Sequence, residues 1–120
     1  MIKIKKEETE SHTISILVDN EAGALARVIG LFSGRGYNIE SLSVAEIDQD
    51  KHKSRITIVT NGSMMTINQI KSQLERLVPV HSVNDITSEG PSIEREMALI
   101  KVVCSKNDRD EVIRLSEVYR

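Results

Sequence analysis

Strand-like and helix-like hydrophobic patterns alternate along this chain, and their order is the feature that most constrains its fold. The order predicts an α+β domain of the ferredoxin-like β-α-β-β-α-β type, in which two helices cover one face of a four-stranded antiparallel sheet. The predicted elements are a strand at 13–18, a helix with Leu25, Val28, Ile29 and Phe32 on one face, strands at 38–47 and 54–60, a helix with Ile67, Ile70, Leu74 and Leu77 on one face, and a strand at 80–87.

Glycine, proline and polar residues mark the boundaries between these elements. Gly34 and Gly36 predict the exit from the first helix, because glycine readily adopts the left-handed conformation that ends many helices. The polar residues 48–53 predict a charged hairpin turn between the two middle strands, and Pro79 predicts the end of the second helix. The pair 84–85, Asn-Asp, predicts a bulge in the last strand.

A second, shorter unit is predicted after this domain. Residues 97–104 favour a strand, and 107–108 can cap a helix that carries Val112, Leu115 and Tyr119 on one stripe. A lone strand and helix cannot close a sheet, because the strand keeps unpaired edges. We therefore expect a flexible tail at 1–11, a complete domain at 12–88, a linker at 89–95 and the truncated start of a second ferredoxin-like domain at 96–120. The alternative is that this last unit completes its sheet on a partner.

Composition excludes several classes of function. A formal net charge of −2 and a pI near 5.9 give no basic face for nucleic acid, and 2% aromatic residues are too few for a base-stacking platform. No segment reaches the ~18 apolar residues of a membrane span. Cys104 is the single cysteine, so a disulfide framework is excluded and a cytoplasmic location is expected. We expect Cys104 to be buried, because it lies in an apolar run.

The chain shows no catalytic constellation. Gly34 and Gly36 follow a helix instead of a strand, so they do not form a dinucleotide-binding fingerprint. The three histidines, His12, His52 and His81, have no metal-ligand spacing and are expected on the surface or on a strand face. A ferredoxin-like acylphosphatase would need an arginine loop after the first strand, and none is present. Met64 and Met65 are interpreted as cover for the core.

The turn between the first strand and the first helix is the candidate binding site. Asn20 and Gly23 lie where the strand ends and the helix begins. The first turn of a helix has backbone N–H groups without intrahelical partners and the positive end of the helix dipole, so a carboxylate can dock there. Gly23 lacks a side chain that would block a close approach. The pattern therefore favours a site for a small carboxylate ligand.

Three segments carry a resemblance to a known family: Asn20–Ser33, Arg35–Leu42 and Glu94–Met97. They resemble the regulatory, or small, subunits of acetolactate synthase, also called acetohydroxyacid synthase (AHAS), which begin with an ACT domain. The resemblance covers about residues 12–120. It implies a homodimer of ACT domains whose sheets join side by side, with valine or a related branched-chain amino acid at the interface. Family members usually carry a complete second ferredoxin-like domain.

The resemblance also implies which residues bind this effector. Asn20, Gly23, Ala24 and Leu25 would come from one protomer, and Asn38 and Ile39 from the other. The N–H groups of Gly23, Ala24 and Leu25 suit a carboxylate, the asparagine amide oxygens suit an ammonium group, and Leu25 and Ile39 suit an aliphatic side chain.

The implied function is regulatory, with no catalytic residue, metal ligand or cofactor in this chain. Such a subunit binds the catalytic large subunit of acetolactate synthase, which uses thiamine diphosphate, Mg and FAD. It raises the activity of that subunit and confers feedback inhibition in valine, leucine and isoleucine biosynthesis. The alternative is an ACT-type amino-acid sensor attached to a different enzyme or to a transcription regulator.

Overall fold

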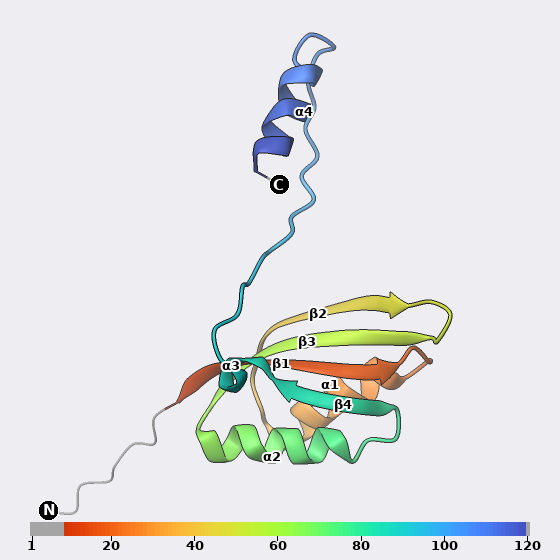
Figure 1. Ribbon diagram of the computed structural model, residues 1–120, viewed down its shortest axis with the longest axis vertical. Coiled ribbons are helices and arrows are strands. Elements are labelled where there is room, and N and C mark those ends of the chain that lie inside the picture. The colour runs from red at the N-terminus through yellow and green to blue at the C-terminus, as the bar shows by residue number, and fades with distance from the viewer. Residues whose placement is uncertain (1–8, 120) are drawn as a thin grey trace, which may run out of the picture.

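A four-stranded antiparallel sheet with two helices on one face forms the main body of the protein (Figure 1). The structure is a computed structural model that describes residues 9–119. The strands lie in the order β2-β3-β1-β4, and the predicted β-α-β-β-α-β order is confirmed. The elements are β1 (Glu10–Asp19), α1 (Ala24–Arg35), β2 (Ile39–Asp48), β3 (Lys53–Gly62), α2 (Met64–Glu75) and β4 (Val80–Asp85).

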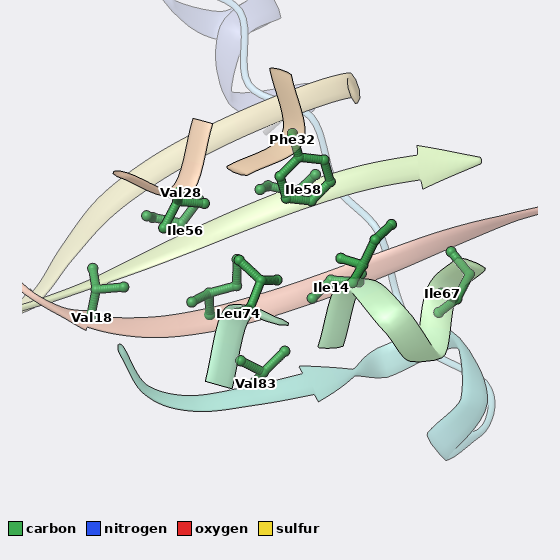
Figure 2. Packing of buried hydrophobic residues seen from close by; sticks show 11 residues of the cluster. Ile14, Val18, Val28, Phe32, Ile56, Ile58, Ile67, Leu74 and Val83 are labelled. Atoms are coloured by element: carbon green, nitrogen blue, oxygen red, sulfur yellow. The ribbon is translucent and has the colours of Figure 1, made fainter. Parts of the chain in front are cut away.

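The core lies between the sheet and the two helices (Figure 2). Alternate residues of β1 and β3 face the helices, because side chains in a strand point to opposite faces in turn. Ile14 pairs with Ile58 and Ile16 with Ile56, and all four are fully buried. The helices contribute five more fully buried apolar side chains, which are Val28, Phe32, Ile67, Ile70 and Leu74. Each such side chain stabilises the fold by roughly 1.5–3 kcal/mol through burial.

Local capping explains where α1 ends and where α2 begins. Gly36 has a φ of 71°, and the N–H of Tyr37 donates to the carbonyl of Phe32 at 2.9 Å, which closes α1 as predicted. Ser63 precedes α2, and its hydroxyl oxygen accepts from the N–H of Thr66 at 3.2 Å. α2 ends at Glu75, before Pro79.

Strand β4 differs from its prediction in two respects. The pairing with β1 shifts between Leu17 and Val18, where Val18 pairs with Val80, so the irregularity lies at His81 and not at 84–85 as predicted. The strand ends at Asp85, and the short helix α3 (Ile86–Glu89) replaces the end of the predicted strand. The Asp85 carboxylate accepts from the N–H of Ser88, and this cap favours a helical turn over an extended backbone.

The predicted strand at 97–104 is absent, and this part of the prediction is wrong. The backbone there is extended but unpaired, Met97 and Leu99 are 87% and 94% exposed, and the segment runs away from the sheet (Figure 1). A strand needs a neighbour to bond its N–H and C=O groups, and no partner strand exists among residues 9–119. Cys104 is consequently exposed instead of buried.

The ends of the described chain also differ from expectation. Helix α4 (Arg109–Val118) follows Asp108 as predicted, but Leu115 and Tyr119 of its apolar stripe are exposed. At the other end, β1 already begins at Glu10, so residues 10–11 of the expected tail belong to the sheet. Residues 1–8 lie outside the described residues. No helix within 9–119 has the length and apolar character to span a membrane.

Candidate effector site

The turn from β1 into α1 presents the exposed start of a helix. Gly23 occupies the N-cap position with φ at 86°, a left-handed conformation that favours glycine. No side chain caps this end of α1, and its first turn contains no acidic residue. No atom lies within 4 Å of the position that a Cβ on Gly23 would occupy. The start of α1 is therefore open and carries the positive end of the helix dipole.

Backbone hydrogen bonds hold this turn from several sides. The N–H of Asp19 donates to the carbonyl of Pro79 at 2.8 Å, and the N–H of Asn20 donates to the carbonyl of His52 at 2.6 Å. Within the turn, the N–H of Glu21 donates to the backbone carbonyl of Asp19 at 2.9 Å. These bonds fix the backbone on which Asn20 is presented at the surface.

One of the three predicted carboxylate donors is already used. The N–H of Ala24 donates to the carbonyl of Glu21 at 3.3 Å, and the Ala24 side chain is buried. Among the described residues, the N–H groups of Gly23 and Leu25 have no hydrogen-bond acceptor. Two of the three predicted donors, the N–H groups of Gly23 and Leu25, are therefore free beside the exposed side chain of Asn20.

The other two predicted effector contacts lie at the far end of α1. Asn38 directly precedes β2 and Ile39 is its first residue, and the carbonyl of Asn38 accepts from the hydroxyl of Thr60 at 2.6 Å. Helix α1 has 12 residues, so its two ends are roughly 18 Å apart. One chain does not bring Asn38 and Ile39 together with Asn20 and Leu25.

Both α1 and the edge strand β2 carry exposed apolar side chains. Leu25 and Ile29 are 37% and 36% exposed, so of the predicted apolar face of this helix only Val28 and Phe32 are buried. On β2, Val44 and Ile47 are each 46% exposed. Because β2 is the outermost strand, its outer row of N–H and C=O groups is unpaired within the described chain.

Sequence reasoning missed two histidine pairs. His12 lies on a face of strand β1, as one of the two predicted placements has it, but it is buried against Asp85; His81 forms a hydrogen bond with the Asp19 carboxylate at the edge of the candidate site. Met64 and Met65 are exposed and do not cover the core, and the side chains that α2 buries are Ile67, Ile70 and Leu74. Among residues 9–119, no group of three or more His, Cys, Asp or Glu side chains could hold a metal ion.

Comparison with known proteins gives the family. Residues 14–82, more than half of the chain, match the family described as AHAS small subunit-like ACT domain. This chain belongs to that family. The chain is 50% identical over 107 residues to the acetolactate synthase isozyme 3 small subunit of Escherichia coli, covering 89% of this chain and 64% of the relative. It is 45% identical over 119 residues to the acetolactate synthase small subunit of Aquifex aeolicus, covering 98% of this chain and 61% of the relative.

Solved structures agree with the fold. The acetolactate synthase small subunit of Thermotoga maritima superimposes with a TM-score of 0.58 at 38% identity, covering 63% of this chain and 47% of that one. The ACT domain of a GTP pyrophosphokinase from Chlorobium tepidum superimposes with a TM-score of 0.59 at 13% identity, a likeness in fold alone. The chain spans only 64% and 61% of the two curated relatives' lengths.

Proposed function

We propose that this ACT domain is the effector-sensing part of an acetolactate synthase regulatory subunit and that it binds valine or a related branched-chain amino acid. The observation that carries the proposal is the open start of α1, where the N–H groups of Gly23 and Leu25 have no acceptor within the described chain. A carboxylate at this position would satisfy both donors and interact favourably with the helix dipole. The exposed amide of Asn20 would then face the ammonium group.

The proposed site is completed by a second copy of the chain. Asp48 of β2 pairs with Lys53 of β3, which in turn pairs with Asp19 of β1. The end of β2 therefore lies at the same end of the sheet as the effector turn, which is the turn from β1 into α1. An antiparallel pairing of β2 with its symmetry mate would bring the start of the partner's β2 to that end. Asn38 and Ile39 of the partner subunit would thereby approach the effector turn. The exposed Leu25, Ile29, Val44 and Ile47 support an apolar interface there.

The proposed role in the assembly is control of a catalytic large subunit. Relatives with this ACT domain are named as small subunits of acetolactate synthase. We propose that this chain binds such a large subunit, raises its activity and makes it sensitive to the amino acid. Coupling of about 1–3 kcal/mol between the effector site and the catalytic subunit would be sufficient. The unpaired segment 97–104 supports a second domain, or a partner, that completes its sheet.

Isothermal titration with valine, leucine, isoleucine and alanine tests the effector proposal. We expect one valine site per ACT interface, with a Kd between about 1 μM and 1 mM for a ligand of this size. Sedimentation in parallel should show a dimer. A folded dimer that binds none of the four amino acids would contradict the proposal. Capture of the large subunit by the tagged chain separates an acetolactate synthase regulator from a sensor for a different enzyme.

A pair of substitutions at Gly23 tests the anion site. Gly23→Asp places a carboxylate where the ligand's own carboxylate would dock, so valine affinity should fall tenfold or more, as expected for like charges in contact. Gly23→Asn has nearly the same size and tolerates the left-handed conformation, so it measures crowding alone. Unchanged valine affinity in Gly23→Asp would exclude this site. An equal loss of valine affinity in both variants would show that the size of the added side chain, and not its charge, weakens binding.

A further inference from the structure

The turn between β2 and β3 reaches the effector turn through a backbone contact. The carbonyl of His52 accepts from the N–H of Asn20 at 2.6 Å, and the neighbouring Lys53 pairs with Asp19 across the sheet. Asn20 follows the last residue of β1, so this bond is an extension of the β1–β3 ladder into the loop. The position of Asn20 therefore depends on a residue that is 32 positions away in sequence.

His52 holds an uncommon backbone conformation. Its φ is 50°, and it is the only non-glycine residue among 9–119 with a positive φ. Two bonds inside the turn support this conformation: the N–H of Lys51 donates to Oδ1 of Asp48 at 3.1 Å, and the N–H of His52 donates to the carbonyl of Gln49 at 3.4 Å. Histidine, asparagine and aspartate visit this region more readily than most residues, whereas β-branched residues rarely do.

The side chain of His52 does not account for this arrangement. The residue is exposed, and no described side chain makes a hydrogen bond or ion pair with its imidazole ring. What the position supplies is a backbone carbonyl, which the left-handed conformation of the residue directs toward the N–H of Asn20. On the other side of the turn, the carbonyl of Pro79 holds Asp19. Asn20 itself is held by His52.

We propose that His52 is a positioning residue for the effector site, acting through its backbone carbonyl on Asn20. This inference rests on the proposed function of the turn as an effector site. The left-handed backbone at His52 directs the carbonyl toward the Asn20 N–H, and the bond sets the place from which the Asn20 amide meets the ligand's ammonium group. If the turn leaves this conformation, the hydrogen bond between Asn20 and His52 is lost. Ligand binding must then restore the position of Asn20, and this lowers the apparent affinity.

A substitution series at His52 tests the proposal. The series varies how readily the residue at this position adopts a positive φ, and it does not test the chemistry of the imidazole side chain. We expect His52→Gly and His52→Asn to keep valine affinity within about twofold of the parent chain, because both residues accept a positive φ. His52→Ala should weaken binding about threefold, and His52→Val about tenfold or more. Lys51→Val is the matched control, because it places the same β-branched residue in the same turn at an ordinary φ; its affinity should be unchanged.

A second readout does not depend on the effector. The amide hydrogen of Asn20 should exchange with solvent at least fivefold faster in His52→Val than in the parent chain, while the amides of the buried Ile16 and Ile58 keep their protection. Unchanged Asn20 exchange in a folded His52→Val protein would overturn the positioning role. The positioning role would also be overturned if the parent chain binds valine and all His52 variants bind it with the same affinity. Failure of the parent chain to bind any amino acid would instead overturn the proposed function.

Discussion

Nδ1 of His12 lies 2.8 Å from Oδ2 of Asp85, and both residues are 3% exposed. Asp85 also accepts from the hydroxyl of Ser88 at 2.7 Å, so one carboxylate joins the start of β1 to the end of β4 and to α3. Nε2 of His12 lies 3.4 Å from the Glu10 carboxylate without forming a hydrogen bond. The pair thus holds the point where the chain leaves the sheet toward its C-terminal segment.

Removing the charge of Asp85 should destabilise the domain. Asp85→Asn keeps the shape of the side chain but replaces an acceptor that serves both His12 and Ser88. Hydrogen bonds to charged groups contribute about 1.5–3 kcal/mol each, so we expect the unfolding free energy at pH 7 to fall by about 2 kcal/mol. Urea denaturation measures the change. Asp50→Asn, in the exposed hairpin turn, should stay within about 0.5 kcal/mol of the parent chain.

The pKa of the Asp85 carboxylate predicts how the unfolding free energy of the domain depends on pH. Burial raises the pKa of Asp85, but hydrogen bonds from Ser88 and His12 and the charge of His12 outweigh burial and leave the pKa below its ordinary value of 3.8. The unfolded chain therefore binds a proton at Asp85 before the folded chain does, so the stabilisation is complete above about pH 5 and is lost as the pH falls through the folded pKa. The difference in unfolding free energy between the parent chain and Asp85→Asn should narrow between about pH 4 and pH 2. A difference that stays constant over this range would contradict the lowered pKa.

The fold could be predicted because its main signals are local. The alternation in β1 and β3 and the helical spacing of Ile67, Ile70 and Leu74 each report which face is buried, and Gly36 reports a helix end within a few residues. The strand predicted at 97–104 failed for the opposite reason. Its residues favour an extended backbone, which the chain adopts, but a strand also requires a partner that local sequence does not specify.

The candidate site was predictable to the extent that it is continuous in sequence. Asn20, Gly23 and Leu25 lie in one turn, and the structure places them there. The spacing of the residues alone could not show that the N–H of Ala24 donates to the carbonyl of Glu21, because this bond depends on the backbone conformation of the turn. Nor could it identify His52, whose contribution is a carbonyl common to every residue. The cap of α3 had a readable signal in Asp85 and Ser88, an acceptor three residues before a donor.

Thr60→Val should weaken the start of β2. Thr60 is fully buried, and its hydroxyl donates to the carbonyl of Asn38 at 2.6 Å. Valine keeps the shape but removes the donor, so we expect a loss of about 1 kcal/mol in unfolding free energy. Valine affinity should fall as well if Asn38 contacts the effector. Thr57→Val is the control, because Thr57 lies on the other face of the same strand and makes no side-chain hydrogen bond within the described chain. Equal effects of the two substitutions would exclude a specific role for the Thr60 hydroxyl.

Trypsin should cut the segment between the domain and α4 before it cuts the sheet. Lys101 lies in an extended, exposed and unpaired stretch, whereas Arg55 lies inside β3, where the backbone is bonded to strands on both sides. Cleavage at Arg55 requires the sheet to open, and an opening free energy of about 3 kcal/mol or more slows it roughly 100-fold or more. A time course followed by mass spectrometry should show cleavage after Lys101 first, and Lys101→Gln should remove that product. Protection of Lys101 equal to that of Arg55 would mean that residues 97–104 are paired in solution. Loss of this protection on dilution would then identify a second copy of the chain as the partner.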